Sequence, residues 1–433
     1  MSDPTMKRDE EIVRMVRGFV APLRRQAPPA DLQERLKDVI RPRRRRRPPG
    51  SLVGGLATLA VVAAVLAVGV QIRALHSPSS SSWQVMSVPS GFNANTISCT
   101  NSGECWAVGG ATQGQSSVWQ YADGVWHTVI GPQEGTLTGL ACAADGTCWA
   151  VGSLDTSPDG TGLLQPLIER YAGAGFTAVS SPPISGDLDW LSAVTCVGAD
   201  DCWAVGQSGA DQMLGGDGIA HPLIEHYGGA GWTSVTGSGP LASGSLDAVT
   251  CVTVNDCWAV GQADYDTSLI EHYTGSAWSA VSASQMVGVG PGTDRLTGVS
   301  CLSAGDCWAV GTSSDNYPTL VHYAAGVWAA AGGPAVNAPA GGLDSVTCEA
   351  SAGTCWAVGL SNPGTVGLPA GVTLKPSMIA HPLIEHYVSG SWSVVPSSQV
   401  GSAGGELNGV ACIPSTGACY AVGGSLGETV ASL

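Results

Sequence analysis

Fourteen cysteines are the most regularly spaced reactive side chains in this 433-residue sequence. Five residues separate the members of five pairs, and six residues separate those of two. The pairs are Cys99/Cys105, Cys142/Cys148, Cys196/Cys202, Cys251/Cys257, Cys301/Cys307, Cys348/Cys355 and Cys412/Cys419. Sequence alone does not choose among all pairings, but the sevenfold repetition favours seven local, structural disulfides. Zinc sites prefer shorter spacings and a closely packed second pair, so we expect no metal and no redox cofactor here.

Histidines and glutamates recur beside these pairs in the segment PLIEHY. The histidines are His226, His272, His322 and His386, with Arg170 in their place in the second repeat, and the glutamates are Glu169, Glu225, Glu271 and Glu385. A ring of histidines suggests a metal site. Each histidine belongs to a different repeat at one structural position, however, so a packing role within the repeat structure is the preferred interpretation. The tryptophans of CWAVG are interpreted as core in the same way, with a stacked sugar site as the alternative.

Recognisable catalytic constellations are absent from the sequence. Residues 74–433 contain three cations, so they lack the arginine cluster that sialidase-type propellers need, and Asp123–Trp126 is a fragment of their Asp-box. No serine elbow, phosphate loop or zinc motif is present. Acid pairs such as Asp155/Asp159, Asp187/Asp189 and Asp264/Asp266 follow no EF-hand pattern, and solvated loops are preferred over calcium sites. We expect no catalytic residue and no enzyme.

The cysteine pairs lie in a repeat with a period of about 43 to 64 residues. Its unit reads L-x-x-V-x-C, C-W-A-V-G, a variable loop, P-L-I-E-H-Y, a glycine turn and G-x-W-x-x-V. Four short β-branched or aromatic runs per unit predict four strands, named a to d, which is the composition of a propeller blade. The cysteine pairs count seven units, and each pair is expected to bridge the end of strand a to the start of strand b. We therefore predict an all-β, seven-bladed β-propeller of four-stranded blades over 83–433.

The two ends of the repeat array are complementary. The last unit ends after strand c, and WQVMSVP at Trp83–Pro89 matches the strand d pattern ahead of the first strand a. This N-terminal strand is predicted to complete the last blade and close the ring, which removes exposed sheet edges.

Charge divides the chain at an apolar segment. Residues 1–50 carry 14 Lys and Arg against 7 Asp and Glu, whereas residues 74–433 carry three cations against 27 acids, a net charge of −24. Leu52–Val70 is 19 uncharged residues, about 28 Å of helix, and it follows an arginine block. We predict a transmembrane helix over 51–72 rather than a cleaved signal peptide. The prediction is a single-pass cell-membrane protein with a cytoplasmic N-terminus and an extracytoplasmic propeller.

The predicted cytoplasmic tail, residues 1–50, is basic and forms short helices, the second with a capping-box pattern at Asp31 and Glu34. Residues 73–82 form the linker. In an antiparallel blade, the a–b and c–d turns share one face, here the disulfide face. The b–c loops and d–a connections share the other, the loop face. The b–c loops are long at Ser153–Gln165, Gln207–His221 and Leu360–His381, and variable loops on a rigid scaffold are where binding usually evolves. The loop face is predicted to point away from the membrane.

The CWAVG, LIEHY and G-x-W segments resemble the cysteine-paired propeller repeats of high-GC, actinobacterial-type bacteria, and more distantly Kelch and galactose-oxidase-like propellers. APPADLQERLKDVI with the arginine block resembles the region before the membrane span in anti-sigma factors. Neither resemblance assigns a catalytic residue.

The preferred function is a membrane-anchored extracytoplasmic binding propeller whose ligand is an extracellular protein or a glycan. One alternative is a transmembrane sensor whose tail binds a cytoplasmic regulator, as an anti-sigma-like protein would. The other is a carbohydrate-active enzyme that uses acids of the central channel. The acidic propeller excludes nucleic acid as a partner.

Overall fold

The structure is a computed structural model. The residues it describes are 83–112, 115–157, 163–173, 175–184, 186, 188–209, 219–235, 243–263, 267–289, 294–333, 341–361, 381–395, 405–424 and 430–432. They belong to one compact unit, Ser80–Leu433.

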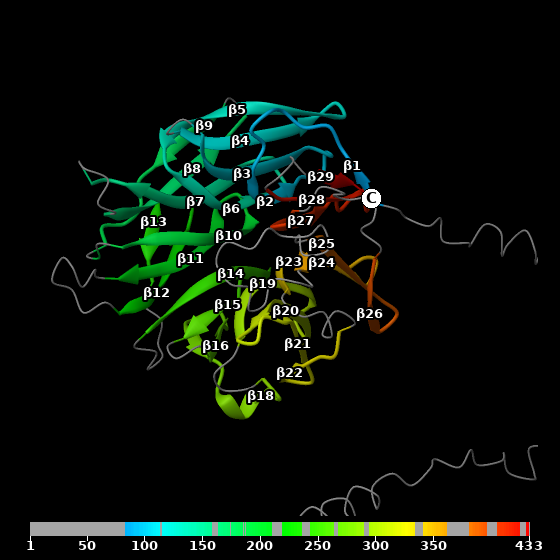
Figure 1. Ribbon diagram of the computed structural model, residues 1–433. Helices are drawn as coiled ribbons and strands as arrows, with labels where there is room; N and C mark the ends of the chain where they lie inside the picture. Colours follow the sequence, from blue (N-terminus) through cyan, green and yellow to red (C-terminus); the bar gives the residue numbers. More distant parts are fainter. Residues whose placement is uncertain are drawn as a thin grey trace, which may run out of the picture. The chain divides into compact units, whose positions relative to one another are not determined.

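These residues form seven β-sheets whose innermost strands contact one another in a closed cycle, β2, β6, β10, β14, β19, β23, β27 and back to β2 (Figure 1). The innermost strands, strand a, are β2 (Ala94–Cys99), β6 (Thr136–Cys142), β10 (Trp190–Gly198), β14 (Gly244–Thr253), β19 (Asp294–Ser303), β23 (Gly341–Glu349) and β27 (Gly409–Cys412). The next, strand b, are β3 (Cys105–Thr112), β7 (Cys148–Asp155), β11 (Asp201–Gly209), β15 (Asp256–Ala263), β20 (Asp306–Ser313), β24 (Thr354–Ser361) and β28 (Cys419–Val422). This ring of sheets is a β-propeller.

Outside them lie strands c and d. Strand c is β4 (Gln115–Ala122), β8 (Leu164–Tyr171), β12 (Ala220–Tyr227), β16 (Thr267–Tyr273), β21 (Pro318–Ala324), β25 (His381–Val388) and β29 (Val430–Ser432). Strand d is β5 (Val125–Glu134), β9 (Phe176–Val179), β13 (Trp232–Ser234), β17 (Trp278–Ala280), β22 (Val327–Ala330), β26 (Ser391–Val394) and β1 (Gln84–Val85). All neighbouring a–b, b–c and c–d strands pair antiparallel, so the disulfide turns and the b–c connections lie on opposite faces.

Six sheets are continuous in the chain and are numbered here as blades one to six. The seventh, the closing sheet, takes β27, β28 and β29 from the C-terminal end and β1 from the N-terminal end of the propeller. Gln84 pairs with Ser432 and Val85 with Ala431. Trp83 is 1% exposed and packs edge-on against Trp356 of blade six, with ring centroids 5.3 Å apart. The match of WQVMSVP to strand d therefore correctly predicts this pairing.

The hydrophobic core lies between neighbouring sheets. Strand b carries CWAVG with all five residues buried, because both of its faces are covered by other blades. The tryptophan of each strand b packs on the next sheet; Trp203, for example, contacts Tyr273 at 4.7 Å and Trp278 at 5.3 Å between ring centroids. The prediction that these tryptophans form core between repeats is confirmed.

Seven disulfides join the predicted cysteine pairs, each between strand a and strand b of one sheet. They close the a–b turns at the disulfide face. In the chain-entropy model a loop of this length contributes about 2 kcal/mol per bond.

The place of the disulfide in the strands needs a correction in blades three to six. There strand b begins one residue before its cysteine, because a further residue pair beyond the disulfide still belongs to the ladder. In blade three, for example, Gly198 pairs with Asp201. The cysteines that therefore lie inside strand b, and not at its first residue, are Cys202, Cys257, Cys307 and Cys355.

The predicted fold class needs correction, although the all-β propeller itself is found. Six blades rather than seven are continuous units, because the remaining sheet is shared by the two ends. Blade five has five strands, since β18 (Met286–Val287), after the 3-10 turn η2 (Ala283–Gln285), pairs parallel with β22. The helical tail (1–50), the transmembrane helix (51–72) and the linker (73–82) lie outside the described residues.

The predicted single-pass membrane localisation is also corrected. Across the described ranges of the chain, no helix is long and apolar enough to cross a bilayer. The segment on which the prediction depended, residues 51–72, is outside those ranges.

Candidate functional site: the central channel

Strand a carries a β-bulge at the same place in blades one to six. In blade four, Leu246 pairs with Gly261 and Ala248 pairs with Val260, so Asp247 has no partner in strand b. The equivalent register shift occurs in the other five blades. Bulges re-aim the side chain of the extra residue. Here the extra residues line the central channel, together with the equivalent residue of the closing sheet.

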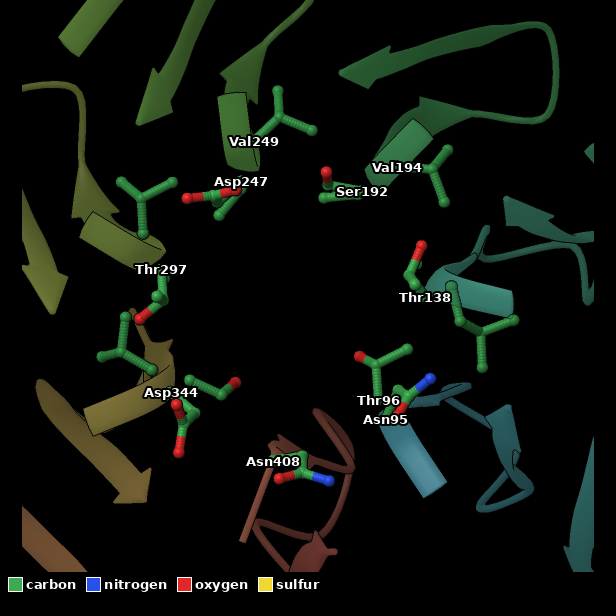
Figure 2. A pocket seen from close by; sticks show the side chains of 18 of the residues that line it. Asn95, Thr96, Thr138, Ser192, Val194, Asp247, Val249, Thr297, Asp344 and Asn408 are labelled. Carbon is green, nitrogen blue, oxygen red and sulfur yellow. The ribbon is translucent and has the colours of Figure 1, made fainter. Parts of the chain in front are cut away.

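We call these seven residues the bulge ring. They are Asn95, Thr138, Ser192, Asp247, Thr297, Asp344 and Asn408, and every one is polar. Figure 2 shows them around the open centre of the channel. The ring lies near the start of strand a, four residues before the first cysteine, or about 13 Å along the strand from the disulfide. It is therefore at the loop-face end of the channel.

The glycine of CWAVG makes room for the bulge. A Cβ built on Gly261 would overlap the carbonyl oxygen of Ser245, two residues before Asp247. The glycines at this position in the other sheets meet the equivalent carbonyl oxygen in the same way. The two most regular parts of the repeat, L-x-x-V and A-V-G, thus cooperate in turning one polar residue per sheet into the channel.

Hydrogen bonds connect four ring members to the next sheet. The Asn95 side-chain amide donates to the Leu137 carbonyl at 2.8 Å, and the Thr138 hydroxyl donates to the Leu191 carbonyl at 2.7 Å. Thr297 donates to the Leu343 carbonyl at 2.7 Å, and Asn408 donates to the Ala94 carbonyl at 3.0 Å. The accepting carbonyl is in each case the residue before the ring position of the next sheet. The ring therefore fixes the blades around the channel.

Two ring positions are carboxylates, which in their ionised form cannot donate such a bond. Asp247 instead accepts two hydrogen bonds from Arg295 of blade five, Nε to Oδ2 at 2.7 Å and Nη2 to Oδ1 at 3.0 Å. The Asp247 side chain is 10% exposed, whereas that of Arg295 is 56% exposed. Among the described residues the only arginines are Arg295 and Arg170, and there is no lysine.

Asp344 has a different environment. Burial raises its pKa to about 6, the Glu406 carboxylate adds to the rise, and the positive charge of Arg295 opposes it. No described residue donates a hydrogen bond to Asp344. Figure 2 shows Asp344 at the edge of the channel, and it is one of the residues that line the cavity. The channel cavity has a volume of about 260 Å³ and is lined by the bulge ring and by the two residues that follow it in most blades.

The cysteines predicted as structural lie at the other end of strand a from this ring. The second cysteine of each pair has no surface that a ligand or a metal could reach. Six of them are 0% exposed, and the seventh, Cys419, is 1% exposed. The fully buried six are Cys105, Cys148, Cys202, Cys257, Cys307 and Cys355. The chain holds no free thiol, so none of the fourteen cysteines belongs to the channel site.

One acidic side chain lies close to a disulfide. Glu349 is beside Cys412 and Cys419, the cysteines of the closing sheet. Their sulfurs are bonded to each other, so they are not available as thiolate ligands for a metal.

The histidines of strand c are dispersed around the ring, and each stacks on the tryptophan of its own blade. His272 lies 3.7 Å from Trp258 between ring centroids, and its Nε2 is 2.8 Å from Asp256 Oδ1. His226 and His322 make the same contacts, with Asp201 and Asp306. His386 stacks on Trp356, and burial lowers its pKa. The packing interpretation is confirmed, and the structure does not gather these histidines.

The glutamates of strand c are buried next to the preceding blade. Ser181 donates to Glu225 Oε1 at 2.7 Å, and burial raises the pKa of Glu225 to about 7. Burial also raises the pKa of Glu271.

Of the loop acids considered for calcium, Asp155 accepts hydrogen bonds from Ser157 and Asp189 accepts one from the Gly209 amide. Asp159, Asp187, Asp264 and Asp266 lie outside the described residues, as do most of the long b–c loops.

The bulge ring is not among the sites that the sequence patterns predict. A signal for it is present: the first variable position of L-x-x-V is polar in all seven repeats. The pattern predicts a strand, and only a comparison of its variable positions between repeats would single out the ring.

Comparison with known proteins establishes the fold alone. No family model matches the chain, and no curated protein matches it. Among solved structures, the chain is similar to "YCF48 bound to D1 peptide", with a TM-score of 0.50, 10% identity, and coverage of 81% of this chain and 94% of that one. It is similar to YCF48 from Cyanidioschyzon merolae, with a TM-score of 0.51, 13% identity, and coverage of 82% and 99%. The WD40 propeller domain of Doa1 has a TM-score of 0.49, 11% identity, and coverage of 81% and 97%. The class that the closed ring of sheets defines is the β-propeller.

Proposed function

We propose that this chain is an interaction propeller that binds a peptide segment of a protein partner at the loop-face mouth of its central channel, without catalysis. The observation that carries the proposal is the bulge ring: all seven sheets turn a polar side chain into one cavity, six of them by means of an irregularity in strand a. Such bulges are structural features that re-aim side chains rather than packing faults.

Two further points support a peptide ligand. The cavity is polar and open enough for one side chain rather than for a whole folded domain, so a partner would insert a residue or a short segment. In addition, a propeller of similar fold is described as bound to a D1 peptide.

The carbohydrate-enzyme alternative is less well supported. An enzyme of that class needs two available carboxyl groups beside the bond that it cleaves. In this channel Asp247 accepts hydrogen bonds from Nε and Nη2 of Arg295, so it is not available as one of the two.

A channel-filling substitution tests the proposal. Ser192→Phe places an aromatic ring in the cavity from blade three, and Ala304→Phe adds the same ring at an exposed turn on the disulfide face. The full chain is used to select binders from a random peptide library, and the selected peptides are titrated against the three proteins. The proposal predicts that Ser192→Phe abolishes binding and Ala304→Phe preserves it, with unchanged melting temperatures. Equal binding to both variants, or selection of glycans only on a glycan array, would refute it.

A further inference from the structure

The bulge ring has two carboxylate positions, and the structure shows how one of them is satisfied. Four of the neutral ring residues donate a hydrogen bond to the next sheet, which an ionised carboxylate cannot do. Asp247 instead accepts two hydrogen bonds from the guanidinium of Arg295 on the next sheet, and the two side chains form a bidentate pair. Paired N–H bonds of this kind are the strongest that a carboxylate makes with a side chain. A basic group in the channel mouth is therefore already part of the fold at one of the two positions.

Asp344 occupies the same position of strand a, two blades further along the ring. Its charged neighbours are Glu406 of the closing sheet, which repels it, and Arg295, which is bound to Asp247. These four groups carry three negative charges and one positive charge when ionised. The mouth of the channel therefore has an excess of negative charge on the side that is formed by blades four to six and the closing sheet.

The net charge of the propeller also favours a positively charged ligand. Residues 74–433 carry a net charge of −24, so the propeller attracts positively charged partners over distances of about the Debye length, 8 to 10 Å. An anionic segment would meet repulsion both at long range and at Asp344.

We propose that Asp344 binds the guanidinium or ammonium group of one basic side chain from the partner, in the way that Arg295 binds Asp247. The inference rests on the proposed function and specifies its ligand. The bound group lies in the channel cavity, donates hydrogen bonds to the Asp344 carboxylate and is attracted by Glu406. Arg295 occupies the neighbouring carboxylate, so a single basic residue is accepted.

The test uses two synthetic peptides that differ in one charge. One is Ac-Gly-Gly-Arg-Gly-Gly-amide, and the other has citrulline, which has the shape of arginine without its charge. Both are titrated against the full chain by calorimetry at pH 8 and low salt. We expect the arginine peptide to bind at least tenfold more tightly, and Asp344→Asn to remove that difference.

The matched control is Asp315→Asn, which removes the same charge at an exposed turn of blade five. It is expected to change the affinity by less than twofold. Equal losses in Asp344→Asn and Asp315→Asn would overturn the inference, because general attraction by the acidic surface would then explain the result. If both peptides bound equally well and Ser192→Phe blocked both, the inference about Asp344 would be overturned, whereas the proposed function would still hold. Binding that Ser192→Phe does not affect would contradict both.

Discussion

Arg295 binds Asp247 of the neighbouring blade with two hydrogen bonds, of 2.7 and 3.0 Å. This pair places the positive charge of Arg295 at the channel mouth, where it also lowers the pKa of Asp344. Arg295 should therefore compete electrostatically with an incoming basic side chain.

Removal of this charge should strengthen binding. Arg295→Gln is expected to bind the arginine peptide about tenfold more tightly at pH 8, since one nearby positive charge is lost and Asp247 becomes available. Arg170→Gln, which removes the other described arginine, from its position over Trp149, should leave the affinity unchanged. Calorimetric titration of both variants measures the effect. Weaker binding by Arg295→Gln would mean that Arg295 itself donates a hydrogen bond to a carbonyl oxygen of the peptide.

Binding of the basic peptide should depend on pH through Asp344. Its pKa of about 6 means that the carboxylate is ionised above neutral pH and protonated in mild acid. The affinity is expected to be constant above pH 7 and to fall about tenfold per pH unit below pH 6, because the protonated group has lost its charge. Titrations between pH 5 and 8 show whether this occurs. The decline should be missing in Asp344→Asn, and a decline of equal size in that variant would assign the titration to another group.

The buried Glu225 should make the propeller more stable in mild acid than in base. Its pKa is raised by burial to about 7, above the ordinary value of 4.5. A group whose pKa is raised in the folded state stabilises the fold fully at a pH below its pKa in the unfolded chain. This contribution to the unfolding free energy is lost as the pH rises through the folded pKa of about 7. As the pH rises from 5 to 8, wild type should lose about 2 kcal/mol of unfolding free energy relative to Glu225→Gln, which has no carboxyl group at this position to ionise.

Denaturant unfolding at the two pH values measures this difference. Glu104→Gln, at an exposed site on the disulfide face, serves as the control and should keep a constant difference from wild type. If Glu225→Gln behaved in the same way, ionisation of Glu225 would not be linked to folding.

The bulge should be destabilised when the glycine that faces it in strand b gains a side chain. Gly261→Ala puts a Cβ into the carbonyl oxygen of Ser245 and is expected to cost about 3 kcal/mol or more, as other substitutions that overfill a packed site do. Gly305→Ala, where a Cβ meets nothing within 4 Å, should cost less than about 1 kcal/mol. Thermal unfolding of both variants compares them. Similar losses would show that strands a and b are not in close contact at the bulge.

Much of the fold could be predicted from the sequence because the same strand and cysteine patterns recur in every repeat. CWAVG marks strand b, the cysteine pairs mark the a–b turns, and Trp83 matches a strand that is missing from the other end of the chain. The fifth strand of blade five could not be predicted in this way. Met286 and Val287 are too short a run to stand out, and their pairing with β22 depends on where the chain passes between blades.

The candidate site was harder to predict because it depends on a register shift. In a regular strand Leu246 and Ala248 would share one face and Asp247 would point away from both. The extra residue of the bulge changes that direction, and its local signals are the recurring polar residue of L-x-x-V and the glycine of the facing strand. The pairing of Arg295 with Asp247 joins two blades across 48 residues and follows only from the closed ring.

A crystal structure of the full chain with the arginine peptide tests the central claim most directly. The guanidinium should lie inside the bulge ring, with its nitrogens within about 3 Å of the Asp344 carboxylate oxygens and with Arg295 still paired with Asp247. A peptide bound on the disulfide face or along an outer strand d, with the channel unoccupied, would contradict it.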